Sequence, residues 1–423
     1  GRPRGPHRRR TLRGLRQAPA RGVRRLIAVR LVRLEGVEHN EPAAVFEDAR
    51  QGELQPRRQE RAKLREGLAE EAVALLVARG HQVLVESGAG EQAHYQDSDY
   101  SESGARIVYD RRQVFQTAMV IKVEPPTLEE VGLMGMRQTL ISALQWTVQS
   151  EGVLEALAKK KTTAIAWDFL QNANGIFPLV RAMGEIAGNT SVLIAGELLA
   201  GPEGRGTLFG GVSGVRPTEV VIIGAGTVGE FAARAAIGLG ATVKVFDNSP
   251  HRLIRLQNAL GQRLWTSTVQ PSVLQEALKT ADVAIGAIRG TGQRAPLIVS
   301  EPMVAGMRRG TVIVDVTIDR GGCFETSRVT SHERPTFTEL DVIHYCVPNI
   351  PSRVSRTASK ALSNIMASSL LEFAADGGVD DAIRKNPFAR SGIYMFHGKV
   401  THAGLAEESG LAHKDLDLLL GTF

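Results

Sequence analysis

Glycines at a fixed spacing carry the strongest chemical signal in this chain. They form the pattern G-x-G-x-x-G directly after the apolar run 220–223. In such a pattern the first glycine permits a tight turn, the second lets backbone N–H groups approach a pyrophosphate, and the third lets a helix pack against a strand. The N-terminus of that helix attracts the phosphate charge. The residues predicted to bind a dinucleotide here are Gly224, Gly226, Thr227, Val228 and Gly229.

An acidic residue stands where the ribose of such a cofactor would lie. Asp247 ends the apolar run 242–246, about 20 residues after the glycines, as the dinucleotide fingerprint requires. Its carboxylate can accept hydrogen bonds from the ribose hydroxyls and would repel a 2′-phosphate, so NAD is expected rather than NADP. A lone glycine motif is weak evidence, but here a strand precedes it, a helix follows it and an acid stands at the right distance.

Further candidates follow the next two apolar runs, 282–288 and 311–318. Ligands of doubly wound folds bind beyond the carboxyl ends of the strands. This rule gathers Ala287, Ile288, Asp319 and the segment 344–351 around one crevice, with Ala287 against the cofactor. An aspartate before two glycines is also a common turn former, but the position of Asp319 after a strand favours a functional role.

Alternating short apolar runs and helical segments precede the glycine motif. Residues 66–79 have helical spacing and stop at Gly80, and residues 82–90 follow as a buried strand with a glycine turn. The alternation recurs through apolar runs that begin at residues 118, 138 and 162, and a long helix is expected over 186–200. This pattern is typical of a parallel sheet with helical crossovers. Residues 201–217 contain six glycines and mark a domain boundary.

The composition excludes several other classes of protein. A chain of 423 residues is expected to form two or three domains, and its 43% hydrophobic and 23% charged residues fit a globular α/β protein. Its two cysteines, Cys323 and Cys346, exclude a disulfide scaffold and favour a reducing, cytoplasmic compartment. We expect Cys323 to be a packing residue, and we expect the chain to have no metal site. It contains no run of about 18 apolar residues of the kind that spans a membrane.

The beginning of the chain differs in charge from the rest. Residues 1–34 hold twelve arginines and no acidic residue, and removing these twelve from the 51 basic residues leaves 39 against 45 acidic ones. The body has no basic stripe with interleaved aromatic residues, so nucleic-acid binding is not expected. Residues 1–60 are interpreted as an Arg-rich leader that is disordered or stems from a misassigned start; a transit peptide would be richer in serine.

Several runs resemble the alanine dehydrogenase and proton-translocating transhydrogenase superfamily. They are GHQVLVESGAG, GEIAGN, GGVSGV, VVIIGAGTVGEFAARAA, VIVDVTIDRGGCFETSRVTSHERPTF and IHYCVPNIPSRVSRTASKALSN. Of these, DRGGCFETSR and HYCVPNIP are more similar to alanine dehydrogenases than to transhydrogenase subunits. The resemblance implies an α/β fold of two Rossmann-like doubly wound domains. An NAD-binding domain is expected over 201–349 and a discontinuous substrate domain over 61–200 plus 350–423, although the family's first strand is not recognisable in residues 1–60.

The resemblance also implies an activity and the residues that perform it. The activity is oxidative deamination of L-alanine to pyruvate and ammonia with NAD, in a homo-oligomer that is commonly a hexamer. Arg65 and Lys122 match positions that hold the substrate carboxylate, and Asp319 matches the family's catalytic aspartate. On the cofactor side, Asp247 and Arg252 match adenosine contacts and Asn349 matches a nicotinamide contact.

Two positions depart from the family's pattern. Family members read K-V-K-E-P after the substrate-domain strand, whereas this chain has Glu124 in place of the second lysine. Glu124 is expected to share a strand face with Lys122, so a substrate site there loses a cation and gains an anion. The family's catalytic histidine falls on Gln145, which cannot exchange a proton near neutral pH. His344 is the nearest replacement, although a lone histidine in an apolar strand is more often a core residue.

The favoured interpretation is therefore an NAD-dependent amino-acid dehydrogenase with alanine as its default substrate. Asp319 would activate water, and Lys122 and Arg65 would orient the substrate carboxylate. Two alternatives stay open. One is another amino-acid or opine-type dehydrogenase whose substrate offers a second positive group to Glu124. The other is a non-catalytic, transhydrogenase-like subunit that binds NAD.

Overall fold

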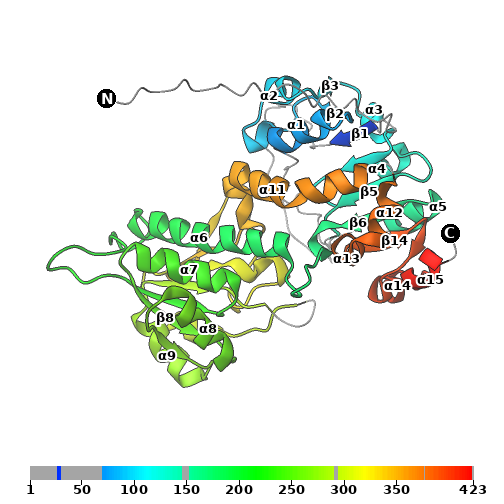
Figure 1. Ribbon diagram of the computed structural model, residues 1–423. Coiled ribbons are helices and arrows are strands. Elements are labelled where there is room, and N and C mark those ends of the chain that lie inside the picture. Colours follow the sequence, from blue (N-terminus) through cyan, green and yellow to red (C-terminus); the bar gives the residue numbers. More distant parts are fainter. Residues whose placement is uncertain (1–25, 30–68, 145–151, 290–293, 376, 422–423) are drawn as a thin grey trace, which may run out of the picture.

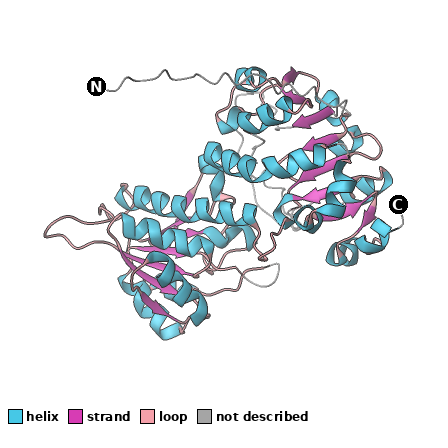
Figure 2. Cartoon of the chain, viewed as in Figure 1, coloured by secondary structure: helices cyan, strands magenta, loops and turns pink. Residues whose placement is uncertain are grey.

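The computed structural model describes residues 26–29, 69–144, 152–289, 294–375 and 377–421, which form two sheets flanked by helices (Figures 1 and 2). The first sheet has the order β15-β14-β6-β5-β4-β1-β2-β3. Its strands are β1 (Leu26–Val29), β2 (Gln82–Glu86), β3 (Arg106–Val108), β4 (Met119–Ile121), β5 (Thr139–Ser142), β6 (Thr163–Ala166), β14 (Ile393–Phe396) and β15 (Lys399–Val400). Strands β1 to β6 are parallel, and β14 and β15 add antiparallel strands from the end of the chain. The expected discontinuous α/β unit is therefore present.

Strand β1 corrects the interpretation of the leader. It lies in the middle of the sheet, where Ile27 aligns with Val83 of β2 on one side and with Met119 of β4 on the other. The interpretation of residues 1–60 as a disordered or misassigned leader, with no recognisable first strand, is wrong for these four residues. The run LIAV is apolar enough for a buried parallel strand, but it is short and stands between Arg25 and Arg30.

The second sheet has the order β12-β13-β11-β10-β7-β8-β9. Its strands are β7 (Glu219–Ile223), β8 (Thr242–Phe246), β9 (Trp265–Ser267), β10 (Val283–Gly286), β11 (Val312–Asp315), β12 (Thr336–Glu339) and β13 (Val342–Tyr345). All pairs are parallel except β12 with β13. Chain order reverses between β7 and β10, so their carboxyl ends form the switch point where doubly wound sheets bind ligands.

Helices cover both faces of each sheet (Figure 2). They are α1 (Glu70–Ala78), α2 (Asp97–Glu102), α3 (Arg111–Phe115), α4 (Leu128–Leu133), α5 (Val153–Lys159), α6 (Pro178–Ala200), α7 (Thr227–Gly238), α8 (Pro250–Leu260), α9 (Pro271–Thr280), α10 (Glu301–Ala305), α11 (Ser355–Ala374), α12 (Gly378–Lys385), α13 (Pro387–Ser391), α14 (Ala403–Ser409) and α15 (Leu416–Gly421). Short 3-10 turns are η1 (Glu91–Ala93), η3 (Trp167–Phe169), η4 (Val316–Arg320) and η5 (Ile350–Val354). Within the described ranges, no helix has the length and apolar character needed to cross a membrane.

The long helix α6 links the two halves of the molecule. It packs against α7 and against α11, and both contacts lie between the two sheets (Figure 1). Leu179 near its start belongs to the core of the first sheet, whereas Ala187 and Leu199 belong to the core of the second. The expected helix over 186–200 is confirmed and begins earlier, at Pro178. The proposed domain boundary near residue 200 therefore follows a helix that contributes to both cores.

Candidate active site

The glycine-rich loop at the end of β7 has the geometry that its spacing predicts. Gly224 has a φ of +117°, and a Cβ there would lie 2.4 Å from the carbonyl oxygen of Ala287. A Cβ on Gly229 would lie 1.8 Å from the carbonyl oxygen of Gly224, so α7 approaches the strand as closely as backbone allows. A Cβ on Gly226 would meet no heavy atom within 4 Å. The second glycine alone therefore faces open space, which is the place where a pyrophosphate needs room.

The N-terminus of α7 completes this anion cradle. The helix begins at Thr227 with Gly226 as its N-cap, and no side chain in the described part of the chain caps it. Thr227 and Val228 are half-buried beside the open space. The first N–H groups of a helix have no partner within the helix and carry a partial positive charge. The loop and the helix together therefore fit the phosphates of a dinucleotide.

Asp247 connects the end of β8 to the glycine-rich loop. The residue is buried, its Oδ2 accepts the N–H of Ala225 at 2.8 Å, and its Oδ1 accepts the N–H of Ser249 at 2.8 Å. The guanidinium of Arg252 lies 3.8 Å from the same Oδ2. A carboxylate has about four lone-pair sites, so Asp247 can order the loop and still accept bonds from ribose hydroxyls. The predicted adenosine contacts Asp247 and Arg252 thus lie together.

Asp319 and Asn349 also meet, beyond the ends of β11 and β13. Asp319 lies exposed in η4, and its Oδ1 accepts the backbone N–H of Asn349 at 2.9 Å. Asn349 has a φ of +58°, in the left-handed region that asparagine enters more readily than most residues. Ala287 follows β10, between this pair and the glycine-rich loop in the strand order. Ala287, Asp319 and Asn349 therefore lie beyond the carboxyl ends of neighbouring strands of the second sheet.

Lys122, at the end of β4, already has an anionic partner. Its Nζ lies 2.5 Å from Oε2 of Glu130 and 3.0 Å from the carbonyl oxygen of Pro125, and both charged side chains are almost fully buried. Glu130 is held in place because it forms a capping box with Thr127 at the start of α4. An ammonium has three N–H donors, so these two partners use two of them. A substrate carboxylate at Lys122 would compete with Glu130.

A small apolar pocket lies beside Lys122, between the first sheet and α11. Its lining residues are Ile121, Lys122, Val123, Ile141, Trp167, Leu362, Met366 and Leu370. The indole N–H of Trp167 donates to the carbonyl oxygen of Val123 at 3.1 Å, which fixes the ring on this wall. Glu124, which follows Val123 in the chain, is half-buried. Arg65 and Gln145 lie outside the described residues, so their predicted roles stay predictions.

His344 has the environment of a core residue. The ring is fully buried in β13, its Nδ1 lies 2.9 Å from the carbonyl oxygen of Val342, and its Nε2 lies 2.7 Å from Oγ1 of Thr326. Phe337 stacks on it with 4.8 Å between ring centroids. Burial lowers the pKa of His344. The core interpretation is confirmed, and His344 is not placed to replace the family's catalytic histidine.

Three residues beside the site were not singled out by the motifs. Glu130 pairs with Lys122, Arg255 donates to the carbonyl oxygen of Ala225 at 3.0 Å, and Asp315 lies buried under the Asp319 loop. A capping-box pattern at Thr127 and an acid at the end of an apolar run are the sequence signals that could have indicated Glu130 and Asp315. Cys323 is a buried free cysteine beside Asp315, and burial raises the pKa of its thiol, so its expected packing role is confirmed.

Comparison with known proteins agrees with this arrangement. Residues 57–187 match the family "Alanine dehydrogenase/PNT, N-terminal domain" and residues 191–403 match "Alanine dehydrogenase/PNT, C-terminal domain". An alanine dehydrogenase of Mycolicibacterium smegmatis is 41% identical over 348 residues, which cover 82% of this chain and 91% of that protein. One of Methanococcus maripaludis is 39% identical over 344 residues, with coverages of 81% and 92%.

Solved structures give the same result. An L-alanine dehydrogenase structure is 36% identical with a TM-score of 0.75, and the match covers 80% of this chain and 94% of that one. A transhydrogenase from Sinorhizobium meliloti is 21% identical with a TM-score of 0.67 over 79% of this chain and 95% of that one, which shows a shared fold. Sequence, fold and site geometry agree: the chain belongs to the alanine dehydrogenase/PNT family.

Proposed function

We propose that this protein catalyses the NAD-dependent oxidative deamination of L-alanine to pyruvate and ammonia, in a reversible reaction. The observation that carries the proposal is the Asp319–Asn349 contact on the same sheet edge as the glycine-rich loop. This contact supports the proposal because a carboxylate that could accept a proton follows β11, in the same sheet whose strand β7 precedes the dinucleotide cradle. The relatives that match most of this chain are named alanine dehydrogenases.

The residues divide the work between binding and proton transfer. Gly226 and the α7 N-terminus hold the pyrophosphate, and Asp247 accepts bonds from the ribose hydroxyls. NAD, when bound, supplies the acceptor for the hydride from the alanine Cα. Water then adds to the carbon of the resulting imine while Asp319 takes one proton from that water. The nitrogen takes up this proton and the hydroxyl releases its own as the C–N bond breaks, so that pyruvate and ammonia form. The N–H of Asn349 holds Oδ1 of Asp319 and so orients its carboxylate.

The test is a screen of amino acids with the purified chain, with NADH formation as the readout. We expect alanine to give the highest kcat/KM. Replacing Asp319 with asparagine should lower kcat by about two to four orders of magnitude, the usual contribution of acid–base assistance, and leave NADH binding unchanged. A chain that binds NADH but oxidises no amino acid would instead support the non-catalytic, transhydrogenase-like alternative.

One observation favours a second candidate substrate class. Lys122 is paired with Glu130 at 2.5 Å, and Glu124 adds a further carboxylate at the position where the family resemblance implies a lysine. An amino acid or opine with a second cationic group would pair with Glu124. Lysine, ornithine and arginine therefore belong in the same screen, and a higher kcat/KM for one of them than for alanine would decide for this class.

We also propose a homo-oligomer, with a hexamer as the expected form. Support comes from residues 206–217, a projecting arm seen in green in Figure 1 that carries the exposed apolar side chains of Leu208, Val212 and Val215. Contiguous exposed apolar groups mark interaction sites in many proteins. Light scattering should show a lower mass for Val212→Asp. The matched change Tyr109→Asp, at an exposed aromatic residue elsewhere, should leave the mass unchanged.

A cytoplasmic location is part of the same proposal. Both cysteines, Cys323 and Cys346, are free and buried, and burial raises the pKa of both thiols. The chain thus forms no disulfide between its two cysteines, which fits a compartment that keeps thiols reduced. Fractionation of cells that produce the protein should recover it with cytoplasmic markers, and recovery with another fraction would contradict this assignment.

A further inference from the structure

Asp315 is a fully buried carboxylate at the end of β11. Its Oδ1 accepts the N–H of Thr317 at 3.0 Å, and its Oδ2 accepts the N–H of Cys323 at 2.9 Å. The hydroxyl of Ser327 donates to the same Oδ2 at 2.8 Å. One carboxylate therefore ties the beginning of the loop that carries Asp319 to its end.

Glycine backbone closes the loop tightly around this carboxylate. Gly321 and Gly322 have φ values of +93° and +81°, and they turn the chain back after η4. A Cβ on Gly322 would lie 2.8 Å from Oδ2 of Asp315, and a Cβ on Gly286 would lie 2.7 Å from Oδ1. The carboxylate thus has backbone neighbours on both sides, where a side chain on either glycine would displace it.

The partners of Asp315 are donors without a full charge. In the described part of the chain they are backbone N–H groups, a hydroxyl and the thiol of Cys323 at 3.7 Å, and no basic side chain contributes. A buried carboxylate without a cation is costly unless hydrogen bonds satisfy it. An asparagine here would turn an N–H₂ group toward other N–H donors. The loop conformation therefore depends on an acceptor-only side chain at residue 315.

We propose that Asp315 is a positioning residue, which fixes the loop that carries Asp319 and, through it, the contact between Asp319 and Asn349. The inference rests on the proposed role of Asp319 as proton acceptor. The order of contacts is direct: Asp315 binds both ends of the loop, Asp319 lies within it, and Oδ1 of Asp319 accepts the N–H of Asn349. Loss of the anchor should release Asn349 although the two residues do not touch.

The first experiment is hydrogen exchange of the purified chain, which needs no substrate. Asp315→Asn should speed exchange in peptides over 316–324 and over the segment with Asn349. Ser327→Ala, which removes one donor to Asp315 and is easier to fold, should give a smaller change in the same peptides. The matched control is Asp282→Asn, because Asp282 is also buried in this sheet but lies at the amino end of β10.

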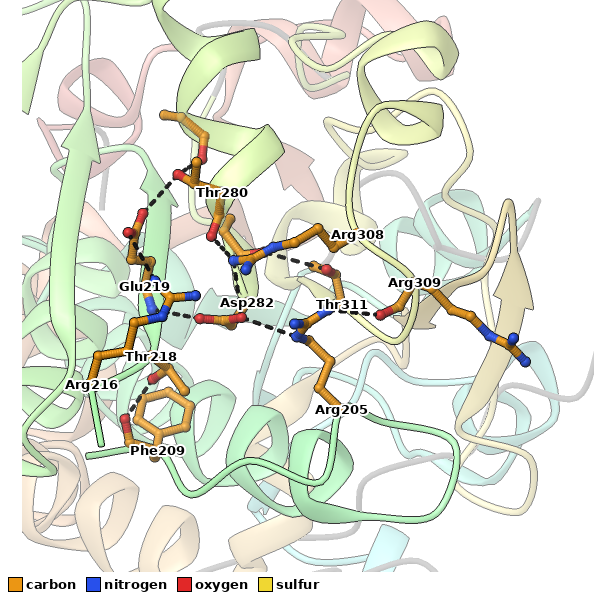
Figure 3. A network of polar contacts seen from close by, with 12 residues as sticks. Arg205, Phe209, Arg216, Thr218, Glu219, Thr280, Asp282, Arg308, Arg309 and Thr311 are labelled. Atoms are coloured by element: carbon orange, nitrogen blue, oxygen red, sulfur yellow. Dashed lines mark hydrogen bonds and ion pairs between the residues drawn. The ribbon is translucent and has the colours of Figure 1, made fainter. Parts of the chain in front are cut away.

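Asp282 is a suitable control because its network is separate (Figure 3). Its carboxylate pairs with Arg205 and Arg308 at 3.1 Å each and accepts the N–H of Glu219 at 2.9 Å. Asp282→Asn should therefore speed exchange near β7 and leave the peptides over 316–324 and Asn349 unchanged. Equal effects of the Asp315 and Asp282 variants on these peptides would overturn the proposal.

The second experiment is a double-mutant cycle on alanine turnover. If Asp315 acts through Asp319, Asp315→Asn should lower kcat about tenfold or more in the wild-type background and about twofold or less beside Asp319→Asn. The dissociation constant of NADH should rise by a smaller factor than kcat falls, because the glycine-rich loop is untouched and only the expected nicotinamide-side contact at Asn349 is released. Ser327→Ala follows the same pattern with a smaller loss.

The outcomes separate this inference from the proposed function. An equal fold-loss of kcat in both backgrounds means that Asp315 acts on stability alone, and the inference fails. If the wild-type chain oxidises no amino acid, the proposed function fails, and the exchange of the Asn349 peptide by itself decides the positioning role. Faster exchange there supports the role, and unchanged exchange overturns it.

Discussion

Replacing Gly226 with alanine should separate cofactor binding from folding. A Cβ at this position meets no heavy atom within 4 Å, and the backbone φ of −77° is open to any residue. Alanine is a poorer N-cap than glycine, by up to about 1 kcal/mol, while it stabilises the fold by about 0.4–1 kcal/mol through the lower entropy of the unfolded chain. The free energy of unfolding should therefore change by less than about 1 kcal/mol.

Cofactor affinity should respond much more strongly to the same change. The added methyl group would occupy the open space above the α7 N-terminus, where the pyrophosphate is expected. Forcing one extra carbon into a fitted contact costs about 1–3 kcal/mol, which corresponds to a roughly 5- to 150-fold weaker dissociation constant. Titration of NADH fluorescence, with a denaturant unfolding curve of the same sample, measures both quantities.

Gly229→Ala is the control, because it should lower the stability of the fold, whereas Gly226→Ala should lower the affinity for NADH. Its Cβ would lie 1.8 Å from the carbonyl oxygen of Gly224, so the backbone must move and unfolding should become easier by about 1–3 kcal/mol or more. Affinity similar to wild type in Gly226→Ala would refute the assignment of the cradle to the pyrophosphate. A loss of stability in Gly226→Ala as large as in Gly229→Ala would refute the claim that the space is open.

Two further predictions concern specificity. Asp247→Ser should narrow the preference for NADH over NADPH, and it should also weaken NADH binding because Asp247 accepts the N–H of Ala225 as well. Fluorescence titration of both cofactors measures the two dissociation constants. Equal affinities of the wild-type chain for NADH and NADPH would contradict the role of Asp247. Glu124→Lys should lower KM for alanine by restoring a cation, but should sharply weaken a substrate with a second positive group. Steady-state kinetics with both substrates shows whether Glu124→Lys raises or lowers kcat/KM for each of them. A lower kcat/KM for alanine in this variant would favour the cationic substrate.

Four strands of the second sheet, β7, β8, β10 and β11, could be predicted from sequence because their signals are local, whereas β9 and β12 were not predicted. The glycine spacing, the apolar run before it and Asp247 after it all lie within one strand–helix–strand unit. The first strand of the other sheet could not be predicted, because four apolar residues between arginines carry little periodicity. Only the tertiary structure identifies β1 as a strand, because it pairs with β2 on one side and with β4 on the other.

The motifs could not predict which residues contact Lys122 and Asp315, because these contacts also depend on tertiary structure. Glu130 reaches Lys122 because α4 turns back over the end of β4, and sequence patterns do not specify that angle. Asp315 reads as one more residue of an apolar run, and its role emerges only from the loop that folds over it. Family resemblance transfers positions along a chain, but which atoms meet at those positions depends on tertiary packing.

The charges around Lys122 restrict how an amino acid can bind there. Glu130 pairs with Lys122 and also lies 3.8 Å from the guanidinium of Arg111, while Glu124 places another carboxylate two residues after Lys122. Two like charges about 4 Å apart repel by about 4 kcal/mol at the effective dielectric constant of a protein surface. A substrate carboxylate near Glu124 therefore needs a cation from another segment. The family resemblance assigns that part to Arg65, so alanine can be the substrate only where the attraction of Arg65 exceeds the repulsion of Glu124.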